Sequence, residues 1–237
     1  MQLTIRDITK SFGTKQVLKG ASFTFQQGGV YALLGRNGSG KTTLFNCLSD
    51  EFPPDSGTIL LEDSKGARPL TQQDVGYVLS TPVVPDFLTG YEFVKFFLRI
   101  VKPAQTRTPD QWLELVGIPE EDRHRLLGDY SHGMKNKIQM LCLLIQRPPV
   151  ILLDEPLTSL DVVASLEMKR LLWEMRHEHI LILSTHILQL ATDLCDHIVV
   201  LNHGLLEEVS PSLIHDPEFE SKIVEILQDA PEEPDHV

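Results

Sequence analysis

Strand-length runs of mainly apolar residues recur along the chain and predict a sheet that is buried on both faces. These runs occupy residues 30–34, 75–79, 150–153, 180–184 and 198–201. Helical patterns that begin at Val162 and Ile187 separate the last three runs. Strands that alternate with helices in this way are typical of parallel βαβ units. We therefore predict an α/β fold with a mostly parallel sheet, followed by a hairpin strand at residues 205–209.

The N-terminal part has a different pattern, in which short strand-like stretches lie between glycine turns. Strands are expected at residues 3–5, 16–18, 22–25 and 58–61. Their hairpin-length connections predict an antiparallel β subdomain. Phe12 falls in one of these connections. Its ring either stacks on a flat ligand such as adenine or is an ordinary half-buried aromatic side chain, and the local sequence leaves both open.

Between residues 80 and 147 the pattern becomes helical. Thr89 and Thr108 each precede a Glu or Gln by three residues, which is the spacing of a capping box, and a third helix is expected from Gly133 to Gln146. We predict one domain over residues 1–215, with a core formed by 1–79 and 148–215 and an inserted helical subdomain at 80–147. Residues 216–237 are expected to form a C-terminal helix and an acidic, proline-rich, disordered tail.

The composition is that of a soluble globular protein, with 237 residues, a mean hydropathy of -0.06 and a formal net charge of -12. The negative charge argues against a nucleic-acid partner and against adhesion to anionic lipid. No apolar run is long enough to cross a bilayer, and the N-terminus lacks the pattern of a signal peptide. We expect a cytoplasmic protein with no direct membrane insertion, whose role at a membrane would depend on a protein partner.

The cysteines and histidines show no pattern of a metal site. Cys47, Cys142 and Cys195 are widely spaced in helix-like surroundings and are expected to be buried free thiols. The sequence Cys195-Asp196-His197 lacks further metal ligands nearby. His177-Glu178-His179 is expected to be a solvated helix end.

Residues 35–42, Gly-Arg-Asn-Gly-Ser-Gly-Lys-Thr, match the phosphate-binding loop pattern and lie between a predicted strand and a predicted helix. The glycines allow the backbone to wrap around phosphate oxygens, and the N–H groups of the loop and of the helix N-terminus attract them. Lys41 can reach the β- and γ-phosphates, and the Thr42 hydroxyl can ligate magnesium. The sequence therefore predicts binding of a nucleoside triphosphate with Mg²⁺. The predicted binding residues are Gly35, Asn37, Gly38, Ser39, Gly40, Lys41, Thr42 and Thr43.

Two carboxylates, Asp154 and Glu155, follow directly after the apolar run at 150–153. Ligands of a parallel sheet bind at the carboxyl ends of its strands, next to the phosphate loop. Asp154 is predicted to hold the magnesium ion and Glu155 to polarise the attacking water. The alternative is that both carboxylates cap the next turn and remain solvated.

Three further motifs accompany the loop and the carboxylates. They are Tyr130-Ser131-His132-Gly133-Met134-Lys135, Ser159-Leu160-Asp161 and Ser184-Thr185-His186. In this order and spacing, the motifs resemble those of the nucleotide-binding subunit of ATP-binding cassette (ABC) transporters. The resemblance covers residues 1 to about 215 and implies the ABC-type P-loop NTPase fold, with ATP and Mg²⁺ as ligands and ATP hydrolysis as the reaction.

The resemblance also implies roles for individual residues. In this family two domains sandwich two ATP molecules, so Ser131 and Gly133 would contact the γ-phosphate held by the opposite subunit. His186 would join Lys41 and Glu155 as a catalytic residue at the γ-phosphate. Asp161 would communicate across the dimer, with helix N-capping as its alternative. Phe12 becomes the expected platform for adenine.

Two departures from the family pattern bear on function. His132 and Met134 replace a glycine and a glutamine of the common signature, and this form resembles exporters whose permease is a separate chain. Ser80 stands where the family has a glutamine that touches magnesium and the attacking water. Because serine is shorter, either a bridging water substitutes at the metal site or the coupling to the permease is weaker.

The implied partners are a membrane permease and a second ABC ATPase subunit, which is either identical or a different chain. The subunit would lie on the inner face of the cell membrane, held there by the permease. Phe87 and Leu88 either form a groove for the permease or close the core of the helical subdomain. The alternative function is a soluble ABC-type ATPase switch that acts on the ribosome or on nucleic acid.

Overall fold

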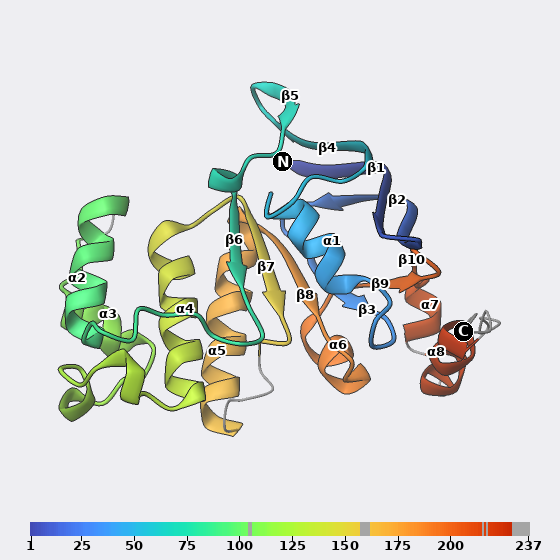
Figure 1. Cartoon of the computed structure of the whole chain (residues 1–237). Coiled ribbons are helices and arrows are strands. Elements are labelled where there is room, and N and C mark those ends of the chain that lie inside the picture. The colour runs from blue at the N-terminus through green and yellow to red at the C-terminus, as the bar shows by residue number, and fades with distance from the viewer. Residues whose placement is uncertain (104–105, 157–161, 215, 217, 229–237) are drawn as a thin grey trace.

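A central sheet of six strands organises the molecule, in the order β10-β9-β3-β8-β7-β6. The computed structural model describes residues 1–103, 106–156, 162–214, 216 and 218–228 (Figure 1). Strands β3, β9, β8, β7 and β6 run parallel, and β10 pairs antiparallel to β9. The six strands are β3 (Val30–Leu34), β6 (Val75–Val78), β7 (Val150–Asp154), β8 (Ile180–Ser184), β9 (His197–Asn202) and β10 (Leu205–Glu208).

The apolar runs form strands because both faces of this sheet are covered. Along β7, Ile151 and Leu153 face a core shared with the helices α3 to α6, whereas Val150 and Leu152 face α1 and the second sheet. Strands β3 and β8 divide their side chains in the same way. All five residues of each of these three strands are buried. The predicted mostly parallel sheet of an α/β fold is confirmed.

The second sheet is antiparallel, in the order β2-β1-β4-β5, as the N-terminal pattern predicted. Its strands are β1 (Gln2–Phe12), β2 (Lys15–Gln26), β4 (Ser56–Asp63) and β5 (Gly66–Pro69). The prediction of short separate strands was wrong, because irregularities in the β1–β2 register, one of them beside Asp7 at φ 52°, absorb the polar positions without ending either strand. Phe12 is consequently the last residue of β1 and not part of a loop.

Helices follow the strands on both sides of the central sheet, and α2, α3 and α4 lie together at one flank (Figure 1). Thr89 and Thr108 form the predicted capping boxes at the starts of α2 and α3. Among the described residues, no helix has the length and the apolarity to span a bilayer. The helices are α1 (Lys41–Leu48), α2 (Gly90–Val101), α3 (Pro109–Leu115), α4 (His132–Gln146), α5 (Val162–Met175), α6 (Leu188–Leu194), α7 (Pro211–Ile214) and α8 (Phe219–Gln228).

Some side chains outside the site differ from expectation. His179 is 2% exposed and not solvated, because its ring turns inward and Nδ1 lies 2.6 Å from the carbonyl oxygen of Pro148. The three cysteines are free, but only Cys47 is fully buried. Phe87 is 79% exposed, so its ring does not close the core of the helical flank. The predicted acidic tail, at residues 229–237, lies outside the described residues.

Candidate functional site

The phosphate-binding sequence forms a tight loop between β3 and α1. Gly38 and Gly40 have φ angles of 80° and 106°, which L-residues with a side chain rarely adopt. Gly35 is needed for a different reason: a Cβ atom there would lie 2.9 Å from the carbonyl oxygen of Leu201, on the neighbouring strand β9. Helix α1 begins directly after Gly40, at Lys41. The loop and the N-terminus of α1 therefore present backbone N–H groups, which suits anionic oxygens.

Lys41 folds back over the loop and is only 8% exposed. Its Nζ donates hydrogen bonds to the carbonyl oxygens of Gly35, at 2.7 Å, and Arg36, at 3.2 Å. Burial lowers the pKa of the ammonium group, and the nearby carboxylates of Glu155 and Asp154 oppose that shift. The cation is thus held at the loop by two carbonyl groups, which a phosphate would have to replace.

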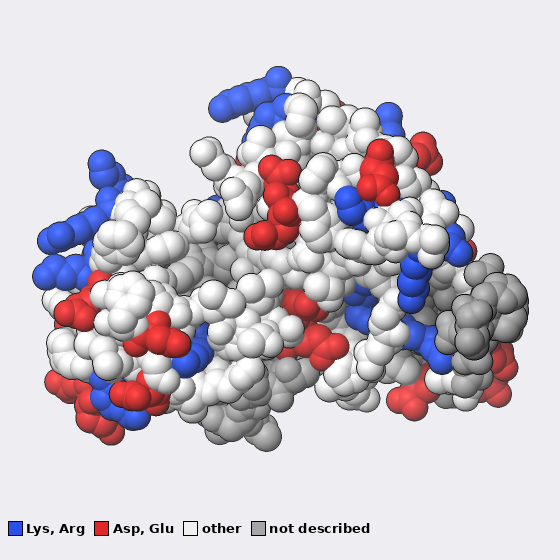
Figure 2. Space-filling view, in the orientation of Figure 1, with Lys and Arg blue, Asp and Glu red and all other residues white. Residues whose placement is uncertain are grey.

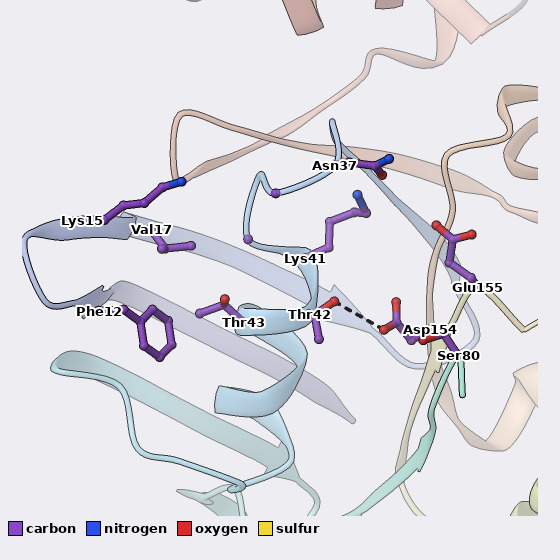
Figure 3. Close-up of a pocket in the computed structure, with 12 residues that line it drawn as sticks. Phe12, Lys15, Val17, Asn37, Lys41, Thr42, Thr43, Ser80, Asp154 and Glu155 are labelled. Atoms are coloured by element: carbon purple, nitrogen blue, oxygen red, sulfur yellow. Dashed lines mark hydrogen bonds between the residues drawn. The ribbon is translucent and has the colours of Figure 1, made fainter. Parts of the chain in front are cut away.

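The carboxyl end of β7 lies beside this loop, as the sequence predicted. Thr42 Oγ1 donates to Asp154 Oδ2 at 3.4 Å (Figure 3). Ser184 Oγ donates to Asp154 Oδ1. Asp154 and Ser184 are neighbours in the parallel register of β7 and β8. Asp154 is 7% exposed, so the carboxylate has a fixed position facing the start of α1 and is not a solvated cap.

Glu155 continues from Asp154 in a bend, with φ at 51°. Its backbone N–H donates to the Ser184 carbonyl oxygen at 3.2 Å, and its Oε1 lies 2.7 Å from His186 Nδ1. A non-glycine residue at positive φ is uncommon and often occurs at functional sites. The bend turns the carboxylate toward the phosphate loop (Figure 3). His186, two residues after β8, holds the carboxylate in this orientation.

These elements surround a cavity of about 470 Å³. It is lined by Phe12, Lys15, Val17, Asn37, Gly38, Gly40, Lys41, Thr42, Thr43, Ser80, Asp154 and Glu155. Figure 3 shows Lys41 and Glu155 at one end of the cavity, and Phe12 and Lys15 at the other. Predicted residues from four separate stretches of the sequence, at Phe12, in the phosphate loop, at Ser80 and at Asp154-Glu155, thus line one cavity.

Phe12 presents half of its ring to solvent at the cavity wall. The ring of Phe52 meets it edge-on, with 5.7 Å between centroids. Lys10 lies over Phe52 at 5.0 Å and is tied to Asp55 at 3.1 Å. Phe12 is therefore supported from one side, and the ring stands where a flat base could stack.

Lys15 and Val17 line the cavity but were not singled out from the sequence. Both belong to β2, directly after the turn that follows Phe12. Only the pairing of β1 and β2 brings this end of the hairpin over the phosphate loop. In the sequence, the one indication that Lys15 and Val17 line the cavity is that they lie close to Phe12.

Ser131 and Gly133 do not line this cavity. Ser131 caps the N-terminus of α4, where its Oγ accepts a hydrogen bond from the Met134 N–H at 3.2 Å. Gly133 lies in the first turn of α4. The structure thus separates the signature residues from the phosphate loop of the same chain. Asp161 lies outside the described residues.

The site offers oxygen donors that suit Mg²⁺. The Thr42 hydroxyl and the Asp154 carboxylate are hydrogen-bonded to each other, and the hydroxyl-bearing Ser80 lines the same cavity. Mg²⁺ is commonly bound by one or two carboxylates together with substrate phosphates, and needs no cage of protein ligands. The described part of the chain contains no cluster of three His, Cys, Asp or Glu side chains placed to hold a metal.

Comparison with known proteins identifies the family. A family model described as "ABC transporter" matches residues 18–158. The chain belongs to the ABC transporter family. It is 30% identical over 214 residues to the bacitracin transport ATP-binding protein BcrA of Enterococcus faecalis, a match that covers 88% of this chain and 69% of BcrA.

This ABC protein is similar to two further proteins, one in sequence and one in fold. It is 36% identical over 222 residues to the sulfate/thiosulfate import ATP-binding protein CysA of Methylococcus capsulatus, covering 88% of this chain and 63% of CysA. A dimeric ATP-binding cassette, MJ0796, in a post-hydrolysis state bound to ADP and Pi, has the same fold, with a TM-score of 0.74 at 20% identity over 88% of this chain and 99% of that one. The ABC protein is the ATP-binding subunit of a transporter and an ATP-hydrolysing enzyme.

Proposed function

We propose that this chain is the Mg²⁺-dependent ATPase subunit of an exporter. ATP draws it together with a second ABC subunit, hydrolysis lets the two part, and this cycle drives a separate membrane permease. The observation that carries the proposal is the convergence of Lys41, Thr42, Asp154 and Glu155 on one cavity, with His186 bonded to Glu155. A phosphate loop beside a fixed carboxylate and a carboxylate–histidine pair is an arrangement that suits phosphoryl transfer.

Glu155 is the proposed general base. Its carboxylate is 21% exposed, so it can reach a water molecule in the cavity and take a proton as that water attacks the γ-phosphorus. The bond from His186 keeps the carboxylate in place, and the imidazole, which is about half exposed, remains available to the γ-phosphate. Lys41 stabilises the charge on the transferred group.

Thr42 and Asp154 would hold Mg²⁺ on the side of the cavity facing α1, with Ser80 reaching the ion through a water molecule. The ion would neutralise charge on the β- and γ-phosphates. The backbone N–H groups of residues 35–43 would bind the same phosphates, and Phe12 would stack on the adenine.

A second subunit would complete the site. The N-terminus of α4, with Ser131 and Gly133, has the positive end of a helix dipole, which favours a phosphate. Because these residues do not line the cavity of their own chain, we propose that they bind the γ-phosphate held by another subunit. Asp161 is proposed to communicate across the same interface.

The direction of transport is proposed from the signature sequence. The Ser-x-Gly-Met-Lys form around Ser131 resembles that of exporters with a separate permease chain, and BcrA, a bacitracin transport protein, is among the similar proteins. CysA is named as an import protein, so family membership alone does not fix the direction. The exposed ring of Phe87 offers a contact for a permease on the cytoplasmic side of the membrane.

Affinity purification from detergent-solubilised membranes tests this proposal. We expect the tagged chain to retain a multi-span protein, and Phe87→Ala to reduce that retention, whereas Phe96→Ala, which removes another exposed ring, should not. Retention on ribosomes or nucleic acid instead would favour the soluble switch. Recovery together with an extracytoplasmic solute-binding protein would indicate an importer and contradict the proposed direction.

A further inference from the structure

Helix α2 carries a row of side chains that point outward and are exposed. The row consists of Glu92, Lys95, Phe96, Arg99 and Ile100, all of them exposed. Their spacing of three and four residues places them along one face of the helix. Phe96 and Ile100 are 56% and 62% exposed, so two large apolar side chains lie next to each other on the helix surface. The opposite face, with Val94 at its centre, packs into the core.

The row is basic, although the protein is acidic. From Phe93 to Pro109 the sequence contains Lys95, Arg99, Lys102 and Arg107 and no aspartate or glutamate, in a chain whose net charge is -12. Glu92, at the start of the row, is engaged in the cap of α2, where its Oε2 accepts the Thr89 N–H at 3.0 Å.

The two cations of the row, Lys95 and Arg99, are followed by a third, Lys102, at the C-cap of α2. Within the described ranges, no ion pair involves Lys95, Arg99 or Lys102. Lys95 lies over the Tyr91 ring at 5.7 Å, and its charge also acts on the Glu92 carboxylate at the start of the helix. Figure 2 shows basic side chains projecting from the flank where Figure 1 places α2.

The acidic residues of the same flank gather elsewhere. Asp110, Glu114, Glu120 and Glu121 line a separate open groove with Arg123 and His124. In Figure 2 the acidic side chains of this flank lie below the basic ones. The row therefore forms a local positive surface, although the net charge of the whole chain is negative.

The shape and chemistry of the row favour a membrane surface over a peptide. A peptide partner is usually bound in a groove or at a sheet edge, whereas this row stands on the convex face of a helix (Figure 2). Cations that flank exposed apolar side chains match an interface in which anionic headgroups lie next to acyl chains. We propose that the α2 row binds the surface of an anionic lipid bilayer, with Lys95, Arg99 and Lys102 at headgroup phosphates and Phe96 and Ile100 between them.

This proposal reverses the expectation, drawn from net charge, that the chain would not adhere to anionic lipid. It involves contact at the surface and no spanning segment. It also does not depend on the proposed exporter function, because none of the row's residues lines the nucleotide cavity.

Vesicle sedimentation with the full chain tests the proposal. The probes are vesicles of phosphatidylcholine alone and of phosphatidylcholine mixed with phosphatidylglycerol. We expect binding only to the anionic vesicles, weakened by salt. Because each cation near such a surface contributes about a factor of five, the variant Lys95→Gln/Arg99→Gln/Lys102→Gln should bind roughly a hundredfold more weakly. The apolar variant Phe96→Ser/Ile100→Ser should bind roughly tenfold more weakly.

A matched control removes the same charge from exposed positions on the antiparallel sheet. The variant Arg6→Gln/Lys19→Gln/Lys65→Gln should change vesicle binding by no more than about twofold. The rate of ATP hydrolysis, measured alongside, should be unchanged in all three variants, which shows that they are folded and separates this test from that of the proposed function.

Three results would overturn the proposal. The first is equal binding to neutral and anionic vesicles, or no binding to either. The second is an equal loss of binding in the α2 variant and in the control. The third is retention of the wild type on immobilised polyglutamate without binding to anionic vesicles, which would indicate an acidic polypeptide as the partner.

Discussion

Removing the Phe12 ring should weaken the binding of ATP without changing the binding of inorganic tripolyphosphate. The ring stands at the cavity wall, half exposed, at the end opposite Lys41 (Figure 3). Tripolyphosphate can bind at the phosphate loop, but it carries no base that could stack on Phe12. A difference between the two ligands therefore measures stacking on the adenine and nothing that happens at the loop.

The size of the effect follows from the contacts of the ring. Stacking of a base on an aromatic side chain contributes about 1–3 kcal/mol by alanine substitution, so Phe12→Ala should raise the Kd for ATP roughly 5-fold to 150-fold. The edge-on contact with Phe52 stabilises the Phe12 ring in its observed position by about 0.5–1.5 kcal/mol. Phe52→Ala should therefore raise the Kd for ATP by a smaller factor than Phe12→Ala. Phe12→Trp should retain most of the affinity.

Isothermal titration with each ligand, in the presence of Mg²⁺, provides the measurement. Phe87→Ala is the matched control, because it removes another exposed phenylalanine ring that does not line the cavity. An equal rise in Kd for ATP and tripolyphosphate in Phe12→Ala would mean that the ring supports the loop and does not bind the base. An unchanged Kd for ATP would remove Phe12 from the site altogether.

Three further predictions concern catalysis, the loop and the fold. His186→Ala should lower the rate of phosphate release about a hundredfold to a thousandfold while ATP still binds, and an unchanged rate would refute its role. Gly35→Ala should abolish ATP binding in a protein with a native circular dichroism spectrum, because the added methyl group would lie 2.9 Å from the Leu201 carbonyl oxygen; wild-type affinity would contradict this. The Arg68 guanidinium lowers the pKa of Asp74 from 3.8 to about 2, so the pair stabilises the fold above pH 3.8 and this contribution is lost as the pH falls through about 2. Asp74→Asn should therefore lower the free energy of unfolding by about 1–2 kcal/mol at neutral pH, the difference should diminish as the pH falls toward about 2, and a difference independent of pH would exclude this linkage.

The central sheet could be predicted because its signals are local. Strands buried on both faces need continuous apolar runs, and β3, β7 and β8 occur where these runs predict them. The capping boxes at Thr89 and Thr108 depend on residues three positions apart, so the sequence alone identifies them.

The prediction failed where tertiary contacts decide the structure. The polar positions of β1 and β2 resemble turns, but pairing with neighbouring strands keeps both strands continuous. His179 resembles a surface residue beside His177 and Glu178, yet the Pro148 carbonyl oxygen draws its ring into the interior. Neither the pairing of these strands nor the contact of His179 with Pro148 can be predicted from the local sequence.

The same distinction applies to the candidate site. The phosphate loop and Asp154-Glu155 are recognisable as motifs, and the parallel register of the strands brings them together. Lys15 has no motif, and its place at the cavity depends on the hairpin that follows Phe12. The contact between His186 and Glu155 likewise depends on the adjacency of β7 and β8. The position at a strand end had indicated Glu155, and the family resemblance had indicated His186.

The central claim is that ATP bound at this loop is enclosed by a second subunit and cleaved with Glu155 as the base. Light scattering of purified Glu155→Gln, with and without saturating ATP and Mg²⁺, tests it most directly. We predict that the variant binds ATP, hydrolyses it about a hundredfold to ten-thousandfold more slowly, and doubles its mass only when ATP is present. A variant that remains monomeric with ATP bound, or that still turns ATP over at the wild-type rate, would contradict the account.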